Sequence, residues 1–537
     1  MTFSRRKFLR NSSVIAATGA VGFPHIGKSA EQLHATRGQK PKHIIHLVAD
    51  GMSMGTLTCA DHLSQIVRGR PLEWLELYKN PAAVSAWMNM RSLNSLVTDS
   101  SAASSSWGCG TRIINGMVNM MGDETPLKTL YELFGDAGWK RGLVTTTEIT
   151  HATPSGFAAS VNNRDKGADI AAQYFERKVD LMLGGGSKFF EARQRKDKRD
   201  LFAEFRAAGY HVMDSRNQLA TAPLDKRWLG TFAKSHVPFT VDHKHNAKHQ
   251  EKVPTLAEMT ESALKWLERS PHFILQVEGG RVDMGCHNCD AAGALYDQIA
   301  FDEALEVCLN FQKRVPDTLL VITTDHGNAN LGLNGSGSAY GQSTWLFRNL
   351  VNAKASFAEM LKALRRNPPD EGKIEETDEE KKEREKKMTK EEKAAADKKK
   401  KIEDEDVATP TEIIDIIAAG TGYKVPYEKA ELLVPHIAKR GKAMYDLMKE
   451  DVCALGQLMA NHWGIGWTGN AHTADYVPVL ALGPGAEKFK GFIQNTEVFY
   501  NYLGFANIDF RNPTEPLITA GPDAHDVENV ASYKYAV

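Results

Sequence analysis

A set of carboxylates, imidazoles and hydroxyls spread along the chain has the residue types of a divalent metal centre. The set comprises Asp50, Asp99, Ser100, Thr153, Glu278, Asp283, His287, Asp325, His326 and His472. Imidazoles and carboxylates suit zinc, whereas carboxylates with a hydroxyl suit the harder magnesium. Asp283 and His287 are four residues apart, so on a helix they would share one face and could bind one ion. Each residue alone could be an ordinary turn or helix cap, but together they predict a metal site.

Several of these residues directly follow short apolar runs that predict buried strands. The runs are 43–49, 142–149, 179–183, 273–277, 319–323 and 477–482. Near-continuous hydrophobic strands are typical of a parallel sheet covered on both faces. Helical patterns such as 256–267 and 291–311 alternate with them. We therefore predict an α/β three-layer sandwich with a mostly parallel central sheet, with ligands bound at the carboxyl ends of its strands.

The composition is that of a globular protein with a large core. The 537 residues are 42% hydrophobic and 25% charged, and the formal net charge is −1. This neutral balance argues against a nucleic-acid binder with a broad basic face. No apolar run reaches the roughly 18 residues that a membrane-spanning helix needs. We expect no nucleic-acid partner and no membrane span.

The first thirty residues (1–30) read as an export signal. Arg5-Arg6-Lys7-Phe8-Leu9 precedes a weakly apolar stretch from Val14 to Phe23, a pattern similar to bacterial twin-arginine signals. The alternative is a basic N-terminal tail. The signal predicts a periplasmic or extracellular protein.

A second unusual segment lies at residues 370–406, where 28 of 37 residues are charged. Such a segment cannot bury a core, so it is either disordered or a solvated charged helix inserted into the fold.

Two further patterns leave alternatives open. Cys286-x-x-Cys289 brackets His287 and could be a redox motif or part of a zinc knuckle, although no second cysteine pair completes a zinc site. The histidines at 243, 245 and 249 form either a loop near the rim of the site or a further metal-binding tract.

Several motifs resemble those of the alkaline phosphatase family, in the family's order. They are Val97–Ala103, similar to the nucleophile motif; His151–Pro154, similar to an Asp/His-Ala-Thr-Pro element; Val277–Asp283 with His287; Thr324–Gly327; and Thr468–Thr473. Arg164 falls where the family has its phosphate-binding arginine. The sequence departs at Ser104–Ser106, at His151, where some members have Asp, and at Met284, where Lys, His or Trp is seen. The resemblance implies one alkaline phosphatase-like catalytic domain over residues 40–537.

By this resemblance, three metal sites and two reacting residues can be assigned. Asp283, His287 and His472 would bind one Zn²⁺; Asp50, Asp325 and His326 a second Zn²⁺; and Asp50, Thr153 and Glu278 one Mg²⁺, with His151 beside it. Ser100 would be the nucleophile that becomes phosphoserine, at the start of a helix whose N–H groups favour phosphate. Arg164 would clamp two phosphoryl oxygens. Members of the family are usually homodimers, so the resemblance implies a possible homodimer. Residues 411–466, where the family varies most, would shape the entrance to the site.

The expected function is therefore that of an exported alkaline phosphatase acting on phosphate monoesters. One alternative is a related two-metal enzyme for phosphodiesters or sulfate esters. Glu278 and Thr153 argue against it, because enzymes of that kind generally lack the third metal site, and Arg164 favours a terminal phosphate with free oxygens. A protein that only stores metal is a third hypothesis, and the intact nucleophile motif disfavours it.

Overall fold

The fold is built on a ten-stranded, mostly parallel central sheet. The computed structural model describes residues 38–335, 340–366, 373–374, 376–394, 396 and 406–518. In spatial order the strands are β14 (Gly491–Gln494), β2 (Val84–Asn89), β13 (Val477–Leu482), β8 (Thr318–Thr323), β1 (His43–Val48), β7 (Phe273–Glu278), β3 (Lys140–Glu148), β4 (Leu181–Gly185), β6 (Trp228–Thr231) and β5 (His211–Met213). Strand β13 runs antiparallel to both of its neighbours, and the other described pairings are parallel.

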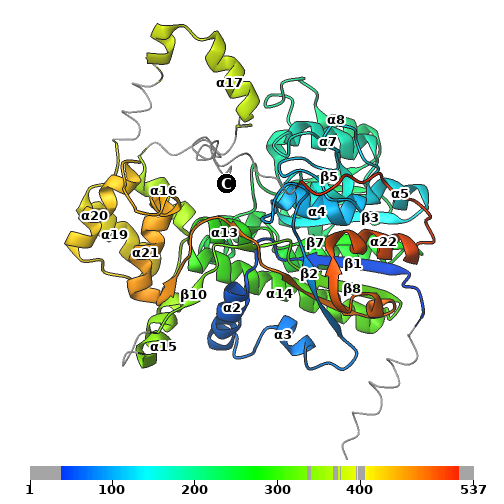
Figure 1. Ribbon diagram of the computed structural model, residues 1–537, viewed down its shortest axis with the longest axis horizontal. Coiled ribbons are helices and arrows are strands. Elements are labelled where there is room, and N and C mark those ends of the chain that lie inside the picture. The colour runs from blue at the N-terminus through cyan, green and yellow to red at the C-terminus, as the bar shows by residue number, and fades with distance from the viewer. Residues whose placement is uncertain are drawn as a thin grey trace, which may run out of the picture.

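Helices cover both faces of this sheet (Figure 1). One layer holds α4 (Ser100–Cys109), α5 (Leu130–Asp136), α6 (Ala152–Ala158), α7 (Gly167–Glu176), α8 (Leu201–Ala207) and α22 (Asn495–Phe505). The other includes α2 (Met54–Val67), α3 (Glu73–Leu77), α12 (Leu256–Leu267), α13 (Arg281–His287) and α14 (Ala291–Arg314). The short helix α9 (Arg216–Ala220) lies between β5 and β6, and α10 (Thr240–His245) and α11 (Ala247–Lys252) lie between β6 and α12.

The pleat of β1 explains why the sheet has two cores. Its side chains alternate, so Ile45 and Leu47 pack in one hydrophobic cluster, whereas Ile44 and Val48 pack in the other. All six residues of the strand are buried. This is the burial expected of a strand covered on both faces, so the predicted three-layer architecture is confirmed.

Strand predictions were accurate at the centre of the sheet and incomplete at its edges. All six predicted runs contain strands, and the helix predicted over 256–267 has those bounds. The run 477–482 is a strand, but it is antiparallel, whereas its apolar pattern predicted a parallel one. Periodicity does not encode direction, because a strand covered on both faces is equally apolar whichever way it runs.

A helical lobe lies to one side of the sheet and contains the segment expected to shape the entrance. It comprises α15 (Tyr340–Arg348), α16 (Phe357–Leu364), α19 (Pro410–Thr421), α20 (Tyr427–Ile437) and α21 (Asp451–Trp463) (Figure 1, left). The short ladders β9 (Gly327–Asn328) with β12 (His472–Thr473) and β10 (Gly332–Leu333) with β11 (Ile465–Gly466) connect the lobe to the sheet. The role of residues 411–466 at the entrance stays a prediction.

Residues 390–394 and 396 of the charged insertion are helical, and they follow the longer helix α17 (Asp378–Lys387). Its side chains are largely exposed, as expected for a solvated charged helix. The Glu380 carboxylate pairs with the ammonium of Lys196 at 2.5 Å, and Ile374 packs against a hydrophobic cluster of the sheet domain. The predicted export signal, residues 1–30, lies outside the described residues.

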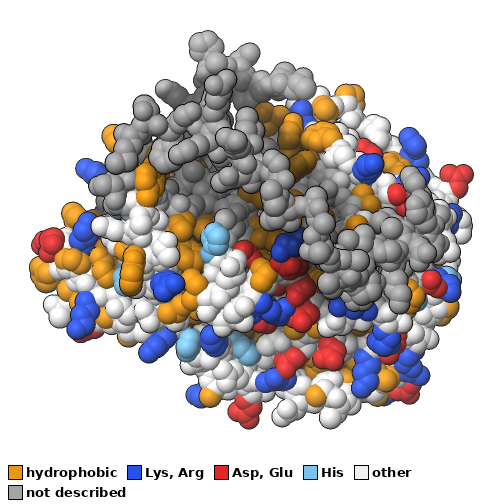
Figure 2. All heavy atoms as spheres, turned by 90° about the horizontal axis from the view of Figure 1, so that it is seen from below, with side chains coloured by type: hydrophobic (Ala, Val, Ile, Leu, Met, Phe, Trp, Pro, Cys, Tyr) orange, Lys and Arg blue, Asp and Glu red, His pale blue; other side chains and the backbone are white. Residues whose placement is uncertain are grey.

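The described surface fits the neutral composition. On the face shown in Figure 2, basic and acidic side chains are interspersed, and the described part of that face has no broad basic area. Among the described residues, no helix combines the length and apolar character needed to cross a bilayer.

Candidate active site

The candidate residues meet at one edge of the central sheet. Val48, the last residue of β1, pairs with Glu278 on β7 and with Thr323 on β8, so these three parallel strands end at the same level. Asp50 and Asp325 follow two residues after β1 and β8. Parallel strands place their carboxyl ends at a common edge, and ligands bind there. The register therefore brings together acidic residues that are far apart in sequence.

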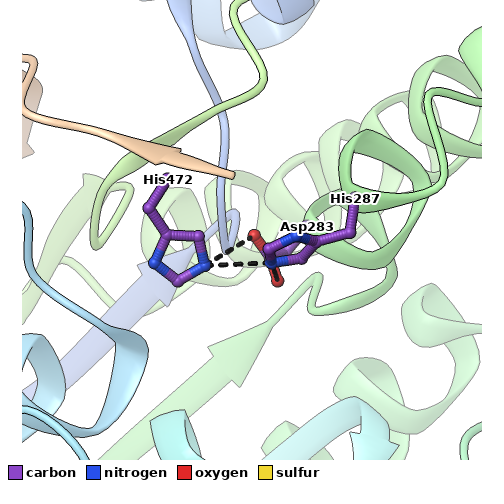
Figure 3. Close-up of side chains that lie close together, drawn as sticks. All are labelled: Asp283, His287 and His472. Atoms are coloured by element: carbon purple, nitrogen blue, oxygen red, sulfur yellow. Dashed lines mark hydrogen bonds and ion pairs between the residues drawn. The ribbon is translucent and has the colours of Figure 1, made fainter. Parts of the chain in front are cut away.

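Asp283, His287 and His472 form the first candidate metal group (Figure 3). Asp283 and His287 share one face of α13, with Oδ2 of the former 3.2 Å from Nε2 of the latter. His472 arrives on β12, and its Nε2 lies 3.0 Å from Nε2 of His287. The Nδ1 atoms of His287 and His472 lie 2.7 Å and 2.9 Å from the carbonyl oxygens of Asn470 and Thr98. These bonds leave both Nε2 atoms directed at the same point, as in a histidine metal site.

Asp50, Asp325 and His326 form the second group, which is fully buried. Nε2 of His326 lies 3.3 Å from Oδ2 of Asp325 and 3.6 Å from Oδ1 of Asp50. Burial raises the pKa of Asp50 well above its usual range, and the nearby Asp325 raises it further. Burial lowers the pKa of His326 to about 4, so its ring is neutral and can donate a lone pair to a metal ion.

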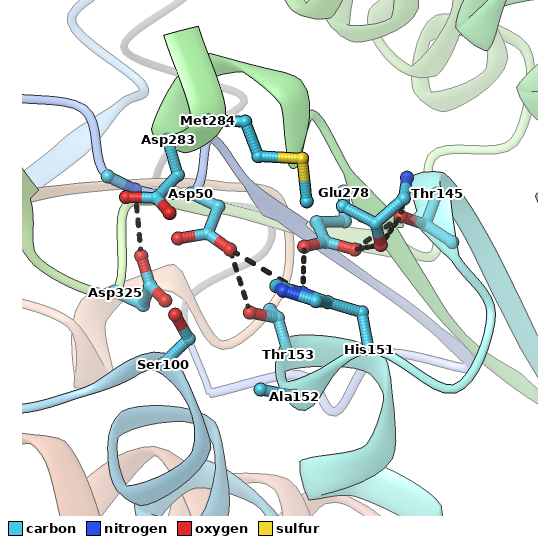
Figure 4. A network of polar contacts seen from close by, with 12 residues as sticks. Asp50, Ser100, Thr145, His151, Ala152, Thr153, Glu278, Asp283, Met284 and Asp325 are labelled. Carbon is cyan, nitrogen blue, oxygen red and sulfur yellow. Dashed lines mark hydrogen bonds and ion pairs between the residues drawn. The ribbon is translucent and has the colours of Figure 1, made fainter. Parts of the chain in front are cut away.

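Asp50 also belongs to a third group, with His151 and Glu278 (Figure 4). Nδ1 of His151 lies 3.8 Å from Oε1 of Glu278 and 4.0 Å from Oδ2 of Asp50. The hydroxyl of Thr153 donates to Oδ2 of Asp50 at 3.1 Å. His151 therefore lies within 4.0 Å of two of the predicted magnesium residues, and geometrically it could itself be a ligand.

Several buried oxygen and nitrogen atoms at these sites lack a hydrogen-bond partner, and a bound cation would provide them with one. Among the described residues, Oδ1 of Asp50, Oδ2 of Asp325, Oε1 of Glu278 and Nδ1 of His151 are buried and make no hydrogen bond. Leaving a buried carboxylate oxygen unpaired costs on the order of 1–3 kcal/mol. Three adjacent carboxylates with orphaned oxygens fit a cluster of divalent cations.

Ser100 stands at the first position of α4, beside the second group. Its Oγ lies 3.1 Å from Nε2 of His326. Asp99 caps the helix by accepting a hydrogen bond from the N–H of Ala102 at 2.8 Å. The helix N-terminus faces the metal groups and favours a bound anion.

Close backbone packing fixes α4 against α6. A Cβ added at Gly108 on α4 would lie 1.7 Å from the carbonyl oxygen of Gly156 on α6. Only a residue without a side chain permits this approach. Helix α4 begins at Ser100, and α6 begins at Ala152, directly after its cap residue His151. The packing of the two helices therefore sets the distance between the second and third metal groups.

Arg164 lies between Asp99 and His151. Its Nη1 is 3.3 Å from Oδ2 of Asp99, and its Nη2 is 3.5 Å from Nε2 of His151. The guanidinium is thus held between His151 and Asp99, the residue before Ser100, and its planar fork suits an oxyanion. The structure therefore brings all of the predicted site residues to one edge of the sheet.

Several supporting residues escaped the sequence analysis. The hydroxyls of Thr145 and Thr147 both donate to Oε2 of Glu278, the second at 3.2 Å, and Asn328 donates to Oδ1 of Asp283 at 2.7 Å. The run of threonines at the end of an apolar strand could have indicated Thr145 and Thr147 from the sequence. The backbone carbonyls that orient His287 and His472 cannot be identified from the sequence.

The two remaining motifs do not form metal sites among the described residues. Cys286 contacts the hydroxyl of Thr56, whereas Cys289 faces Cys453, so the two thiols of the Cys-x-x-Cys motif point to different partners. The histidines at 243, 245 and 249 lie on α10 and α11, which are short helices rather than the expected loop. They belong to none of the three metal groups.

Comparison with known proteins agrees with this geometry. The model of the alkaline phosphatase family matches residues 41–424. Alkaline phosphatase 3 of Bacillus subtilis (strain 168) is 27% identical over 92% of this chain and 97% of its own length. Streptomycin-6-phosphate phosphatase of Streptomyces griseus is 33% identical over 54% of this chain and 74% of its own length.

Solved structures give the same result. The crystal structure of Thermus thermophilus alkaline phosphatase superposes with a TM-score of 0.77 and 30% sequence identity, covering 93% of this chain and 98% of that one. The match of the family model over more than half of the sequence agrees with the order of the motifs and with the three acidic and histidine groups. The chain belongs to the alkaline phosphatase family of metal-dependent enzymes that hydrolyse phosphate monoesters.

Proposed function

We propose that this enzyme hydrolyses phosphate monoesters through a phosphoserine at Ser100. The single observation that carries the proposal is the 3.1 Å separation between the Ser100 hydroxyl and Nε2 of His326, inside the group formed with Asp50 and Asp325. A serine hydroxyl is a weak nucleophile at its ordinary pKa and needs an activating neighbour. Ser100 has such neighbours in the second metal group, and it stands at the N-terminus of α4.

The reaction divides into steps that the residues of the chain can perform. Arg164 binds two oxygens of the phosphoryl group through its fork and orients the phosphorus toward Ser100. Oγ of Ser100 attacks, a P–O bond forms, and the bond to the ester oxygen breaks. The N-terminus of α4 stabilises the negative charge on the phosphoryl group. Water then releases phosphate and restores the Ser100 hydroxyl.

We propose zinc at the first two groups and magnesium at the third. Asp283, His287 and His472 would hold one Zn²⁺, and Asp50, Asp325 and His326 the other, because neutral imidazoles and carboxylates suit this ion. Glu278, Asp50 and the Thr153 hydroxyl would hold Mg²⁺, with His151 adjacent. When bound, such ions supply charge that stabilises the attacking and leaving oxygens of an in-line displacement.

The proposal is tested by comparing an aryl phosphate monoester with the corresponding diester and an aryl sulfate. We expect hydrolysis of the monoester to exceed that of the other two by at least roughly 10²-fold, since Arg164 binds free phosphoryl oxygens. A chelator should remove the metals, measured by mass spectrometry, and abolish turnover. Faster hydrolysis of the diester or sulfate would contradict the proposal, and turnover by metal-free protein would contradict the metal assignment.

We also propose export through the twin-arginine signal and a periplasmic or extracellular location. The proposal rests on Arg5 and Arg6 and the apolar stretch after them. Replacing both arginines with lysine should leave the protein in the cytoplasm of a bacterial host, whereas secretion unchanged by this substitution would contradict it. A homodimer is likewise proposed from the family habit, and light scattering on the purified enzyme tests it.

A further inference from the structure

Two thiols face each other between the helical lobe and the segment that follows α13, the helix that carries His287. Sγ of Cys289 lies 3.6 Å from Sγ of Cys453, and both residues are buried. Cys289 follows α13, two residues after His287, whereas Cys453 is in α21 of the lobe. All six cysteines are free thiols in the described structure. We propose that Cys289 and Cys453 form a disulfide when the folded enzyme meets a disulfide oxidant.

The backbone around Cys289 is arranged to present its thiol to α21. Cys289 has a φ of 49°, the left-handed conformation that normally follows a helix end as glycine or asparagine. On the facing helix, a Cβ added at Gly456 would lie 2.6 Å from Cβ of Cys289. A strained backbone at one position and a glycine opposite it bring the two elements into close contact.

The position of Cys453 makes it the thiol that an oxidant reaches first. It lies in the first turn of α21, which begins at Asp451. The segment before that helix is exposed, including Met444 and Tyr445. Helix ends fray more readily than helix centres, so opening of this turn uncovers Cys453 while Cys289 stays packed against the carbonyl oxygen of Gly469 at 3.4 Å.

The reaction is a two-step thiol–disulfide exchange with a small disulfide such as oxidised glutathione. The Cys453 thiolate attacks one sulfur of the oxidant, a mixed disulfide forms, and one glutathione thiol leaves. The Cys289 thiolate then attacks Sγ of Cys453, the protein disulfide forms, and the second glutathione thiol leaves. Two protein thiols lose two electrons and two protons, and the oxidant disulfide gains them as two thiols.

The expected effect is a firmer hold on α13, which carries Asp283 and His287, and through His287 on the loop before His472. Sγ of Cys289 contacts Gly469, and Nδ1 of His287 contacts the carbonyl oxygen of Asn470. The new bond would fix the segment that follows α13 to α21, and His287 on α13 would keep its contact with the loop at Asn470. Groups that orient metal ligands typically change metal affinity by roughly 10-fold or more, so loss of metal to a chelator should be slower in the oxidised enzyme.

The experiment incubates the purified enzyme with oxidised glutathione a few degrees below its Tm and maps it without reduction. Cys286, Cys289 and Cys308 share one tryptic peptide, so fragmentation must locate the bond. We expect two thiols fewer, a bond between residues 289 and 453, a Tm higher by about 3 °C, and several-fold slower metal release. Cys289→Ser should retain one glutathione on residue 453, and Cys453→Ser should take up none.

Cys308→Ser is the matched control, because Cys308 is a buried thiol on the same tryptic peptide and makes no contact with Cys289 or Cys453 among the described residues. It should still form the bond. A bond between residues 286 and 289, or glutathione on another cysteine in the Cys289→Ser variant, would overturn the proposal. So would absence of the 289–453 bond both after incubation and after refolding with the oxidant present, since refolding exposes every thiol.

Discussion

The hydroxyl of Ser100 and the imidazole of His326 are brought to 3.1 Å by elements that are 226 residues apart in sequence. One lies at the start of a helix and the other just after a central strand. Because burial keeps His326 neutral, its Nε2 is free to bind a cation beside the hydroxyl.

Ser100→Ala should lower kcat by roughly 10³-fold or more, because the covalent route needs the hydroxyl. Metal content should be unchanged, since three other residues make up the second group. Labelling the wild type with phosphate at acid pH should place phosphoserine at residue 100. Ser106→Ala, a buried serine on the same helix whose hydroxyl donates to Ala102, is the control and should label normally. Label at a different residue would disprove the assignment.

His151→Asp should increase magnesium affinity by roughly 10-fold. The substitution adds a carboxylate near Asp50 and Glu278, and Mg²⁺ prefers oxygen ligands to imidazole. Activation by magnesium at fixed zinc should therefore saturate at lower concentration than in the wild type. His243→Asp, outside the metal groups, serves as the comparison and should leave the curve unmoved. Superimposable curves for wild type and His151→Asp would sink the idea.

Asp297→Asn should flatten the dependence of stability on pH. Burial raises the pKa of Asp297 to about 7, although the N–H of Thr240 opposes the shift. A carboxyl with a raised folded-state pKa stabilises the fold fully below its unfolded pKa, near 4, and this contribution is lost as pH rises through 7. The variant cannot ionise, so above pH 7 it should be more stable than the wild type by up to about 4 kcal/mol.

The measurement for Asp297→Asn is Tm from pH 5 to 9 with equal metal loading. Asp242 and Asp290 also have raised pKa values, about 6 and about 7. The slope of Tm against pH should therefore be smaller in the variant than in the wild type, but it should not fall to zero. Asp225→Asn, at an exposed position, should follow the wild-type curve. A variant as steep as the wild type would show that Asp297 does not contribute to the slope, which would contradict the prediction.

The charged insertion should be removable with little loss of turnover. Arg365 and Val407 form an antiparallel bridge, and the N–H of Arg366 donates to the carbonyl oxygen of Asp406. The segment therefore leaves and re-enters the fold at adjacent positions, where a two-residue Asn-Gly turn can replace residues 367–405. Turnover should stay within roughly twofold, since surface insertions contribute little to the core.

The control for the deletion is Lys196→Ala in the full-length chain, which removes only the ion pair with Glu380. An exposed pair of this kind is worth about 0–1 kcal/mol, so this variant should match the wild type. A large loss of activity in the shortened chain alone would mean that the segment organises the site entrance.

The central sheet and the metal groups could be predicted because each depends on a local pattern. An apolar run followed by Asp50 or Glu278 marks both a buried strand and its carboxyl end. His472 differs, because it precedes strand β13, and its side chain reaches the common edge since that strand runs antiparallel. Only the family motif, and no periodicity, placed it there.

The edges of the sheet and the details of the third site could not be read in this way. Strand β2 alternates exposed and buried residues, and β5 has only three residues, so neither has the apolar run of a central strand. The contact between His151 and Arg164 depends on how α6 and the loop after it pack. Such contacts are set by tertiary structure and leave no spacing to detect.

The glycine contact between α4 and α6 has a consequence for how this centre can change over time. Ser100 begins one helix and His151 caps the other, and the backbones touch at Gly108 and Gly156. No intervening side chain can be trimmed or enlarged to widen the gap, so the nucleophile and the third metal group keep a fixed separation. Chemical diversity at this centre must come from exchanging the groups that the helices carry, such as the side chain of His151, which makes no capping hydrogen bond to α6.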